Sequence, residues 1–193
     1  MVDFKDLHNK YNEHNDIFIK MQNDDRLQSN LSNIIALITD TLKNNCKVLI
    51  CGNGGSAADA QHLSAEFQSR FKKERKALNV DALTTNTSIL TAIGNDYSFD
   101  KIFARQVEAK GDAFDILIGI STSGNSKDVI EAFKQARKQD MIIIAMTGDF
   151  EDMESDEYAD YILKVPSKDT ARIQEGHIFL YHIIAEYVEK QFE

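Results

Sequence analysis

Two helical segments of the sequence carry side chains that could hold a metal ion and transfer protons. His62 and Glu66 are four residues apart, so both project from one face of a helix. An imidazole and a carboxylate can bind zinc together, and either can act as a general acid or base. Four-residue spacing is also common in solvent-facing helix pairs, so spacing alone does not establish a metal site.

Further candidate metal ligands lie near the C-terminus. Gln174, His177 and His182 fall within one helical pattern. At about 100° per residue, His177 lies about 60° and His182 about 80° around the helix from Gln174. Helical geometry therefore does not choose between the two histidines.

Two loops are suited to binding an anion or a sugar hydroxyl. The first is GNGGS, Gly52 to Ser56, and the second is STSGNS, Ser121 to Ser126. Each follows a short apolar run and precedes a helical pattern. Glycine lets the backbone approach a ligand, while hydroxyls and the N–H groups of a helix N-terminus can satisfy phosphate oxygens. The alternatives are tight turns in which Ser56 and Ser126 are helix N-caps.

The first loop also has the loose dinucleotide-binding pattern G-x-G-x-x-A, from Gly52 to Ala57. That pattern requires an acidic residue at the end of the second strand. The sequence has Thr84, Thr85 and Asn86 there. A dinucleotide fold also gives no reason for the second, hydroxyl-rich loop, so a dinucleotide-dependent oxidoreductase is disfavoured.

Short apolar runs alternate with helical patterns along most of the chain. We expect strands at 47–51, 80–83, 115–120, 141–146 and 161–165, and helices near 57–71, 87–94, 99–110, 127–139 and 171–191. This alternation predicts a doubly wound α/β fold, a three-layer sandwich with a central parallel sheet. Two amphipathic patterns precede the first strand. We therefore expect one domain over 1–193, with N-terminal helices in 1–45 and the sandwich in 46–193.

Composition restricts the partners of the chain. A net charge of −9 argues against nucleic acid and anionic membranes as partners. The polar start does not resemble a signal peptide, and Cys46 and Cys51 lack CxxC spacing. We expect a reduced, cytoplasmic protein in which Cys51 is a small buried residue and not a nucleophile. The acidic run 151–157 is interpreted as a solvated loop or a short helix.

Four stretches, in order, resemble the phosphoheptose isomerases of the sugar isomerase (SIS) domain superfamily. They are GNGGSAADAQHLSAEF, LTAIGNDYSFDKIFARQVEA, GISTSGNSKDVI and RIQEGHIFLYHIIAEYVE, and the match runs from about Lys47 to the C-terminus. The resemblance implies conversion of sedoheptulose 7-phosphate to D-glycero-D-manno-heptose 7-phosphate through an enediol. It also implies a place at the first step of nucleotide-activated heptose biosynthesis for surface polysaccharide.

The resemblance also implies roles for individual residues. It implies one zinc ion per subunit, bound by His62, Glu66, Gln174 and His182, with Glu66 as the base and His182 as the acid. The implied substrate-binding residues are Asn53, Gly54, Gly55, Ser56, Glu66, Arg70, Asn95, Asp96, Ser121, Thr122, Ser123, Ser126 and Gln174. An arginine at position 70 could almost as well be an ordinary surface residue. Asn95 and Asp96 could instead form the turn at the C-terminus of a helix.

The resemblance further implies a homotetramer with active sites at subunit interfaces. The apolar stripes of the N-terminal helices, including Leu31, Ile34, Ile38 and Leu42, would then pack against neighbouring subunits. Two other functions remain open. One is a non-catalytic SIS-domain protein that binds a replication initiator, which the intact set of ligand types disfavours. The other is an isomerase of another phosphosugar, such as arabinose 5-phosphate or an amino sugar phosphate.

Overall fold

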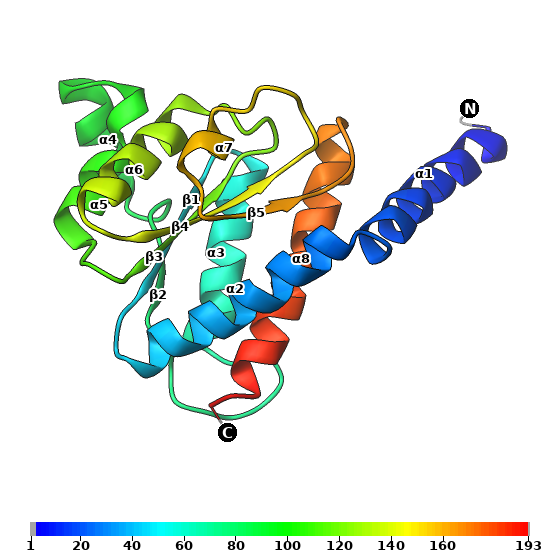
Figure 1. Cartoon of the computed structure of the whole chain (residues 1–193). Helices are drawn as coiled ribbons and strands as arrows, with labels where there is room; N and C mark the ends of the chain where they lie inside the picture. The colour runs from blue at the N-terminus through cyan, green and yellow to red at the C-terminus, as the bar shows by residue number, and fades with distance from the viewer. Residues whose placement is uncertain (1–2, 193) are drawn as a thin grey trace.

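The computed structural model describes residues 3–192, and its helices and strands alternate as predicted (Figure 1). Within these residues no helix is both long and apolar enough to cross a membrane. The predicted helix at 99–110 is divided in two, because Ile102 and Phe103 are buried in the core between its parts. The elements are α1 (Phe4–Gln22), α2 (Asp25–Lys43), β1 (Val48–Gly52), α3 (Gly55–Gln68), β2 (Val80–Ala82), α4 (Thr87–Asp96), the 3-10 turn η1 (Phe99–Lys101), α5 (Ala104–Lys110), β3 (Ile116–Ile120), α6 (Lys127–Lys138), β4 (Ile142–Thr147), α7 (Ser155–Tyr158), β5 (Tyr161–Lys164) and α8 (Thr170–Glu189).

The five strands form one parallel sheet in the order β2-β1-β3-β4-β5. The strand order reverses between β1 and β3, and ligands of open α/β sheets bind at such a switch point. Gly52 at the end of β1 is paired with Ile120 at the end of β3. The two candidate loops therefore leave the sheet side by side.

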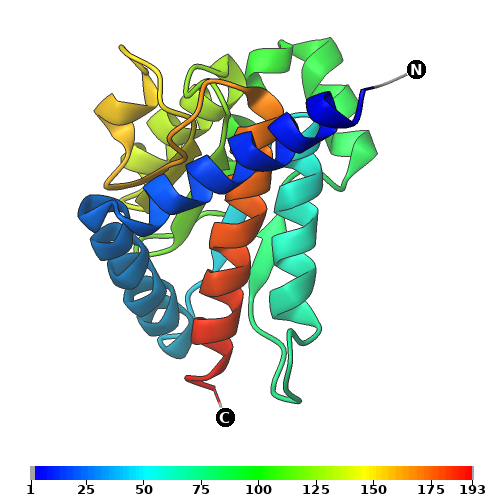
Figure 2. The ribbon, with the colours of Figure 1, turned by 90° about the vertical axis from the view of Figure 1, so that its right-hand side faces the viewer.

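Helices cover both faces of the sheet, which confirms the predicted three-layer sandwich. Alternate strand residues point to opposite faces. Val48 and Ile50 of β1 belong to the core beneath α2, α3 and α8, whereas Leu49 and Cys51 belong to the core beneath α5 and α6. Helices α2, α8 and α3 lie next to one another on the first face (Figure 2). Cys51 is fully buried, as expected for a packing residue.

The two N-terminal helices differ in how they bury their apolar stripes. Leu31, Ile34, Ile38 and Leu42 of α2 are all buried within their own chain. The expectation that this stripe packs against a neighbouring subunit is therefore wrong, because α2 covers its own sheet and contacts β5 and α8.

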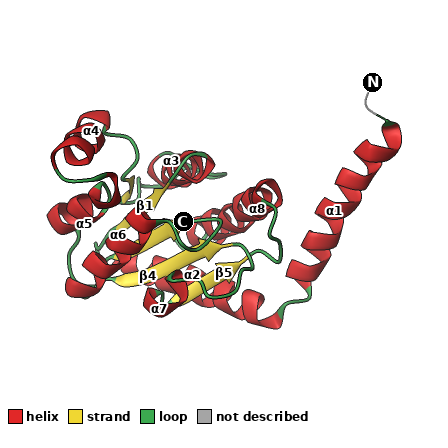
Figure 3. Ribbon diagram, turned by 90° about the horizontal axis from the view of Figure 1, so that it is seen from above, coloured by secondary structure: helices red, strands yellow, loops and turns green. Residues whose placement is uncertain are grey.

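Helix α1 keeps most of its large apolar side chains in solvent. Ile17 and Met21 are buried, but Phe4, Tyr11 and Ile19 are 81%, 71% and 55% exposed. The helix crosses the outer side of α8, and its N-terminal end extends away from the rest of the molecule (Figures 2 and 3).

The acidic run 151–157 contains a short helix, α7, which is one of its two predicted forms. The run is not simply solvated, because Met153 and Ser155 are buried. The Ser155 N–H donates to the Gly124 carbonyl at 3.1 Å, and the Glu154 N–H donates to the Asn125 side chain at 2.7 Å. Residues 154 and 155 thus fix the hydroxyl-rich loop through hydrogen bonds to Gly124 and Asn125.

Candidate active site

A cluster of two histidines and a glutamate lies where α3 and α8 meet. His62 and Glu66 project from α3, and His182 projects from α8. The His62 Nε2 atom is 3.0 Å from Glu66 Oε1 and 3.5 Å from His182 Nε2. One ligand atom from each residue lies within 4.8 Å of the other two. The structure therefore brings together three of the four metal ligands that the family resemblance implies.

The chemistry of these side chains suits a bound cation. Electron-pair donors that face one another repel unless a proton or a positive ion lies between them. Two imidazoles and one carboxylate are a ligand set that zinc accepts, and a further position stays open for another ligand. Burial, reinforced by His62, lowers the pKa of His182, which favours the neutral imidazole that binds metals. The three residues can hold a metal ion.

The structure separates the two histidines that helical geometry left open. His177 is fully buried between α8 and the sheet, and its Nε2 lies 3.2 Å from the Thr147 carbonyl oxygen. Burial lowers the His177 pKa to about 4, so its imidazole stays neutral in the core. His182, and not His177, reaches His62 and Glu66.

Gln174 lies apart from the other three candidate ligands of its own chain. It precedes His182 by eight residues on α8, which corresponds to roughly 12 Å along the helix axis. A Cβ atom added to Gly55 would come within 2.2 Å of Gln174 Nε2, so the amide rests against the glycine-rich loop. The four candidate ligands do not meet within one chain.

The glycine-rich loop leads from β1 into α3. Gly54 caps the helix with φ of +55°, a conformation that favours glycine. Ser56 lies buried inside the first turn, so the interpretation of Ser56 as an N-cap is wrong. The Asn53 side chain donates to Asp128 Oδ1 at 2.9 Å, which connects this loop to the start of α6.

The hydroxyl-rich loop leads from β3 into α6. Ser121 Oγ lies 2.9 Å from Ser126 Oγ and 3.5 Å from Ser123 Oγ. Ser126 occupies the N-cap position, but its side chain makes no capping hydrogen bond. Three hydroxyls thus gather at the positive end of a helix, which is an arrangement that attracts a phosphate group. The Thr122 carbonyl oxygen accepts a hydrogen bond from Gly148 at 2.9 Å, which fixes the loop to the end of β4.

Three other predicted substrate-binding residues lie at two different places in the chain. Arg70 is exposed after α3, with its guanidinium 3.5 Å from Glu74. Asn95 and Asp96 end α4, where the Asn95 side chain donates to Asp96 at 2.9 Å. Helix α4 lies on the opposite side of the molecule from α8 (Figures 1 and 3). One subunit alone does not bring Asn95 and Asp96 to His62.

Two buried residues behind His62 had no signal in the sequence. The Tyr181 hydroxyl lies 2.9 Å from His62 Nδ1 and 3.4 Å from Asp59 Oδ1. Burial raises the pKa of Asp59 to about 6 and also raises the pKa of Tyr181. Their contacts depend on α3 lying against α8, which the sequence pattern does not specify.

A second unpredicted feature fixes the segment after α3. The buried Glu189 carboxylate accepts hydrogen bonds from the N–H groups of Phe71, Lys72 and Lys73, at 2.8, 2.8 and 3.1 Å. The Phe71 ring centroid lies 5.6 Å from that of His182. Through these hydrogen bonds, Glu189 fixes the position of the Phe71 ring beside the cluster.

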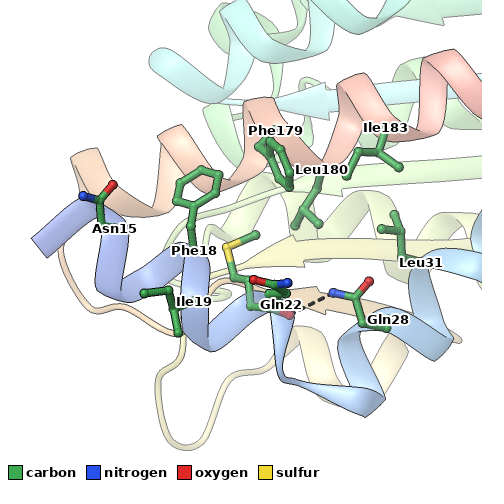
Figure 4. Close-up of a pocket in the computed structure, with 10 residues that line it drawn as sticks. Asn15, Phe18, Ile19, Gln22, Gln28, Leu31, Phe179, Leu180 and Ile183 are labelled. Atoms are coloured by element: carbon green, nitrogen blue, oxygen red, sulfur yellow. Dashed lines mark hydrogen bonds between the residues drawn. The ribbon is translucent and has the colours of Figure 1, made fainter. Parts of the chain in front are cut away.

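A large hollow lies away from the cluster and the two loops. A cavity of about 540 Å³ opens between α1, α2 and α8, and its lining residues include Phe18, Ile19, Phe179 and Ile183 (Figure 4). None of the lining residues belongs to the cluster or to the two loops. Its apolar wall suits another protein surface better than a sugar phosphate, so we do not assign the substrate to it.

A parallel sheet with two anion-suited loops at its switch point, and a His–Glu cluster nearby, defines an α/β domain built to bind and transform a phosphorylated ligand. The family model described as the SIS domain matches residues 11–148. A phosphoheptose isomerase of Campylobacter jejuni is 50% identical over 171 residues, which cover 89% of this chain and 91% of the relative.

Solved structures are similar to the whole chain. A phosphoheptose isomerase from Neisseria gonorrhoeae superposes with a TM-score of 0.88 at 42% identity, covering 96% of this chain and 98% of that one. One from Francisella tularensis superposes with a TM-score of 0.93 at 33% identity, covering 98% and 100%. The chain belongs to the phosphoheptose isomerases of the SIS domain family, as the sequence motifs predicted, and it is an isomerase.

Proposed function

We propose that this protein interconverts sedoheptulose 7-phosphate and D-glycero-D-manno-heptose 7-phosphate. The observation that carries the proposal is the convergence of His62, Glu66 and His182 in a chain that belongs to the phosphoheptose isomerases. A ketose becomes an aldose when a proton leaves C1 and a proton is added at C2, with an enediol in between. A non-catalytic binding protein would have no use for an acid–base cluster of this kind.

Glu66 is the base that removes the proton from carbon. A carboxylate has two oxygens, so Oε1 can face His62 while the other oxygen takes the proton. His182 transfers protons to and from the substrate oxygens, and its lowered pKa favours the neutral imidazole, whose single lone pair either accepts a proton or binds a metal ion.

One zinc ion per subunit would complete the site, and His62, Glu66, Gln174 and His182 would hold it. When bound, the ion would supply Lewis acidity towards the substrate carbonyl group. The protein contributes the fixed positions of the ligands and of the base.

The hydroxyl-rich loop binds the phosphate group. Ser121, Ser123 and Ser126 present hydroxyls at the start of α6, where the helix dipole favours an anion. The polar groups assigned to the rest of the substrate are those of Asn53, Gly54, Gly55, Ser56, Arg70, Asn95, Asp96, Thr122 and Gln174.

Each active site is built from more than one subunit of a homotetramer. Glu66 follows Gly54 by twelve residues, or roughly 18 Å along α3, so the loop and the base of one chain lie far apart. In the tetramer, a neighbouring chain places its own Gln174 and its own two loops next to the His62, Glu66 and His182 cluster of the first chain. The exposed apolar residues of α1 and the hollow beside α8 provide surfaces for such contacts.

The proposed setting is the cytoplasm, at the first step of nucleotide-activated heptose biosynthesis for surface polysaccharide. A panel of substrates tests the assignment. The purified protein is incubated with sedoheptulose 7-phosphate, arabinose 5-phosphate or an amino sugar phosphate, and the products are followed by NMR. Selective conversion of the heptulose supports the proposal, whereas a preference for either other sugar, or no turnover of any, contradicts it.

A further inference from the structure

We propose that Tyr181 and Asp59 are positioning residues that hold His62 in a single tautomer. In that tautomer the proton is on Nδ1, and the lone pair of Nε2 is directed at Glu66 and His182. The inference rests on the proposed function of the cluster, but its direct readout does not require turnover.

The Tyr181 hydroxyl stands between the Asp59 carboxylate and the His62 ring. It is 3.4 Å from Asp59 Oδ1 and 2.9 Å from His62 Nδ1. The rings of Tyr181 and His62 meet edge to face, with centroids 5.5 Å apart. Tyr181 is fully buried and Asp59 is 6% exposed, so water has little access to replace these hydrogen bonds.

The number of protons fixes the direction of this hydrogen-bonded chain. A phenol has one proton to donate, and a carboxylate can only accept. When Tyr181 donates to Asp59, its oxygen is left to accept the Nδ1 proton of His62. A neutral imidazole with its proton on Nδ1 carries its lone pair on Nε2, the atom 3.0 Å from Glu66 Oε1.

The opposite arrangement would disable His62 as a ligand. If Tyr181 donated to Nδ1, the ring would carry its proton on Nε2 and point an N–H at the cluster. Asp59 prevents this by taking the phenol proton. Asp59 lies three residues before His62 on α3, and Tyr181 precedes His182 on α8, so the same two helices carry both the ligands and their supports. Partners of this type commonly contribute 10- to 100-fold to metal affinity.

The test compares Tyr181→Phe with Tyr187→Phe, a control at a 50% exposed tyrosine of the same helix. Zinc affinity is measured by competition with a chromophoric chelator. We expect Tyr181→Phe to bind zinc about 10- to 100-fold more weakly and Tyr187→Phe to bind as the wild type does. An unchanged affinity in Tyr181→Phe would overturn the proposal.

Nitrogen-15 NMR of the metal-free Glu66→Gln protein reports the tautomer, with the His62 signals assigned by their loss on His62→Gln substitution. This background is needed because, without a cation, the Glu66 carboxylate 3.0 Å from Nε2 would itself draw a proton to that atom. We expect the Nδ1-protonated form when Tyr181 is present and loss of that preference in Tyr181→Phe. Asp59→Asn provides a second variant, because an amide can donate to the phenol and thereby turn the Tyr181 proton towards Nδ1. In the Glu66→Gln background, a His62 proton on Nε2 with Tyr181 and Asp59 both present, or a tautomer that neither variant changes, would refute the inference.

These readouts separate the inference from the function on which it rests. A protein that binds zinc through an Nδ1-protonated His62, yet fails to isomerise a heptulose phosphate, would contradict the proposed function and support the inference. Full turnover of the heptulose phosphate, together with a His62 tautomer that does not depend on Tyr181, would support the proposed function and contradict the inference.

Discussion

The Nε2 atoms of His62 and His182 lie 3.5 Å apart, although 120 residues separate the two histidines in the chain. Helices α3 and α8 pack side by side on one face of the sheet and bring them together. The contact makes His182 the partner of His62 and leaves His177 in the core. It also shows which of the proposed site residues meet within one chain, and this determines how the proposed site can be tested.

The first prediction concerns complementation between inactive subunits. His62, Glu66 and His182 meet within one chain, whereas Gln174 does not join them. Mixing Glu66→Gln with Gln174→Ala subunits should therefore restore activity, because a hybrid tetramer contains sites with an intact cluster and an intact glutamine. Mixing Glu66→Gln with His182→Ala is the control and should restore none. Equal recovery in both mixtures, or none in either after confirmed subunit exchange, would contradict shared sites.

The second prediction concerns the phosphate loop. Ser123 is exposed in the loop that precedes α6, so Ser123→Ala should barely change stability. It removes a hydroxyl from the proposed phosphate site, and hydrogen bonds to charged groups contribute about 1.5–3 kcal/mol, so sedoheptulose 7-phosphate should bind roughly tenfold or more weakly. Calorimetric titration measures this, with Ser32→Ala on the exposed side of α2 as the control. Equal binding of the phosphorylated and dephosphorylated sugar by the wild type would count against the loop.

The third prediction concerns the pH dependence of stability. Unfolded histidine takes up a proton near pH 6.5, but buried His177 does so only near about 4. Between these values the unfolded state holds more protons, so His177 makes the free energy of unfolding fall as pH is lowered. The contribution of His177 to the free energy of unfolding is therefore smaller below about pH 4 than above pH 6.5, by roughly 3 kcal/mol.

The variant His177→Gln should therefore lose less stability than the wild type between about pH 7 and about pH 4. Urea unfolding at fixed protein concentration measures it, with exposed His8→Gln as the control. The raised pKa of Asp59 acts in the opposite sense, since the folded state then holds more protons, but it is present in every variant and cancels. Parallel pH profiles for His177→Gln and the wild type would disprove the assignment.

The fourth prediction concerns Glu189. Its side chain and that of Arg75 are 2% and 1% exposed, with Glu189 Oε1 3.5 Å from Arg75 Nε. Burial works to raise the Glu189 pKa, but the backbone N–H groups of Lys72, Phe71 and Lys73 hold it below its ordinary value. Glu189→Ala leaves a buried guanidinium without its carboxylate and should lower the free energy of unfolding by about 3–5 kcal/mol.

Glu186→Ala, one turn earlier on α8, is the matched control for Glu189. Glu186 is 30% exposed and pairs with Lys72 and Lys190. Exposed pairs of this kind contribute no more than about 1 kcal/mol. Denaturant unfolding of both variants checks the contrast, and similar losses would show that Glu189 does not organise the segment at 71–73.

The strands, the two loops and the layer order could all be predicted from the sequence because their signals are local. Apolar runs that end in glycines or hydroxyl residues mark β1 and β3, whereas the pairing of these two strands is seen only in the structure. The choice between His177 and His182 could not be made from the residues alone, because their angles from Gln174 differ little. Packing against α3 decides between them, and only the family resemblance anticipated that choice.

The remaining differences arise from tertiary contacts. Helices α1 and α2 have similar apolar stripes in sequence, yet α2 covers its own sheet while α1 leaves Phe4 and Tyr11 exposed. The role of Tyr181 could not be predicted from the sequence, since a tyrosine next to a histidine is as common in a hydrophobic core as in an active site. Its significance appears only when Asp59 and His62 are seen on the facing helix.

Proton transfer to sedoheptulose 7-phosphate in heavy water tests the central claim most directly. If Glu66 removes the C1 proton through an enediol, the wild type should form the aldose heptose phosphate with solvent deuterium at C2, as followed by NMR. Glu66→Gln should keep the fold and react about 10²- to 10⁴-fold more slowly, while Glu108→Gln, at an exposed glutamate of α5, should react normally. No conversion by the wild type, complete retention of the substrate hydrogen, or near-normal turnover by Glu66→Gln would contradict the account.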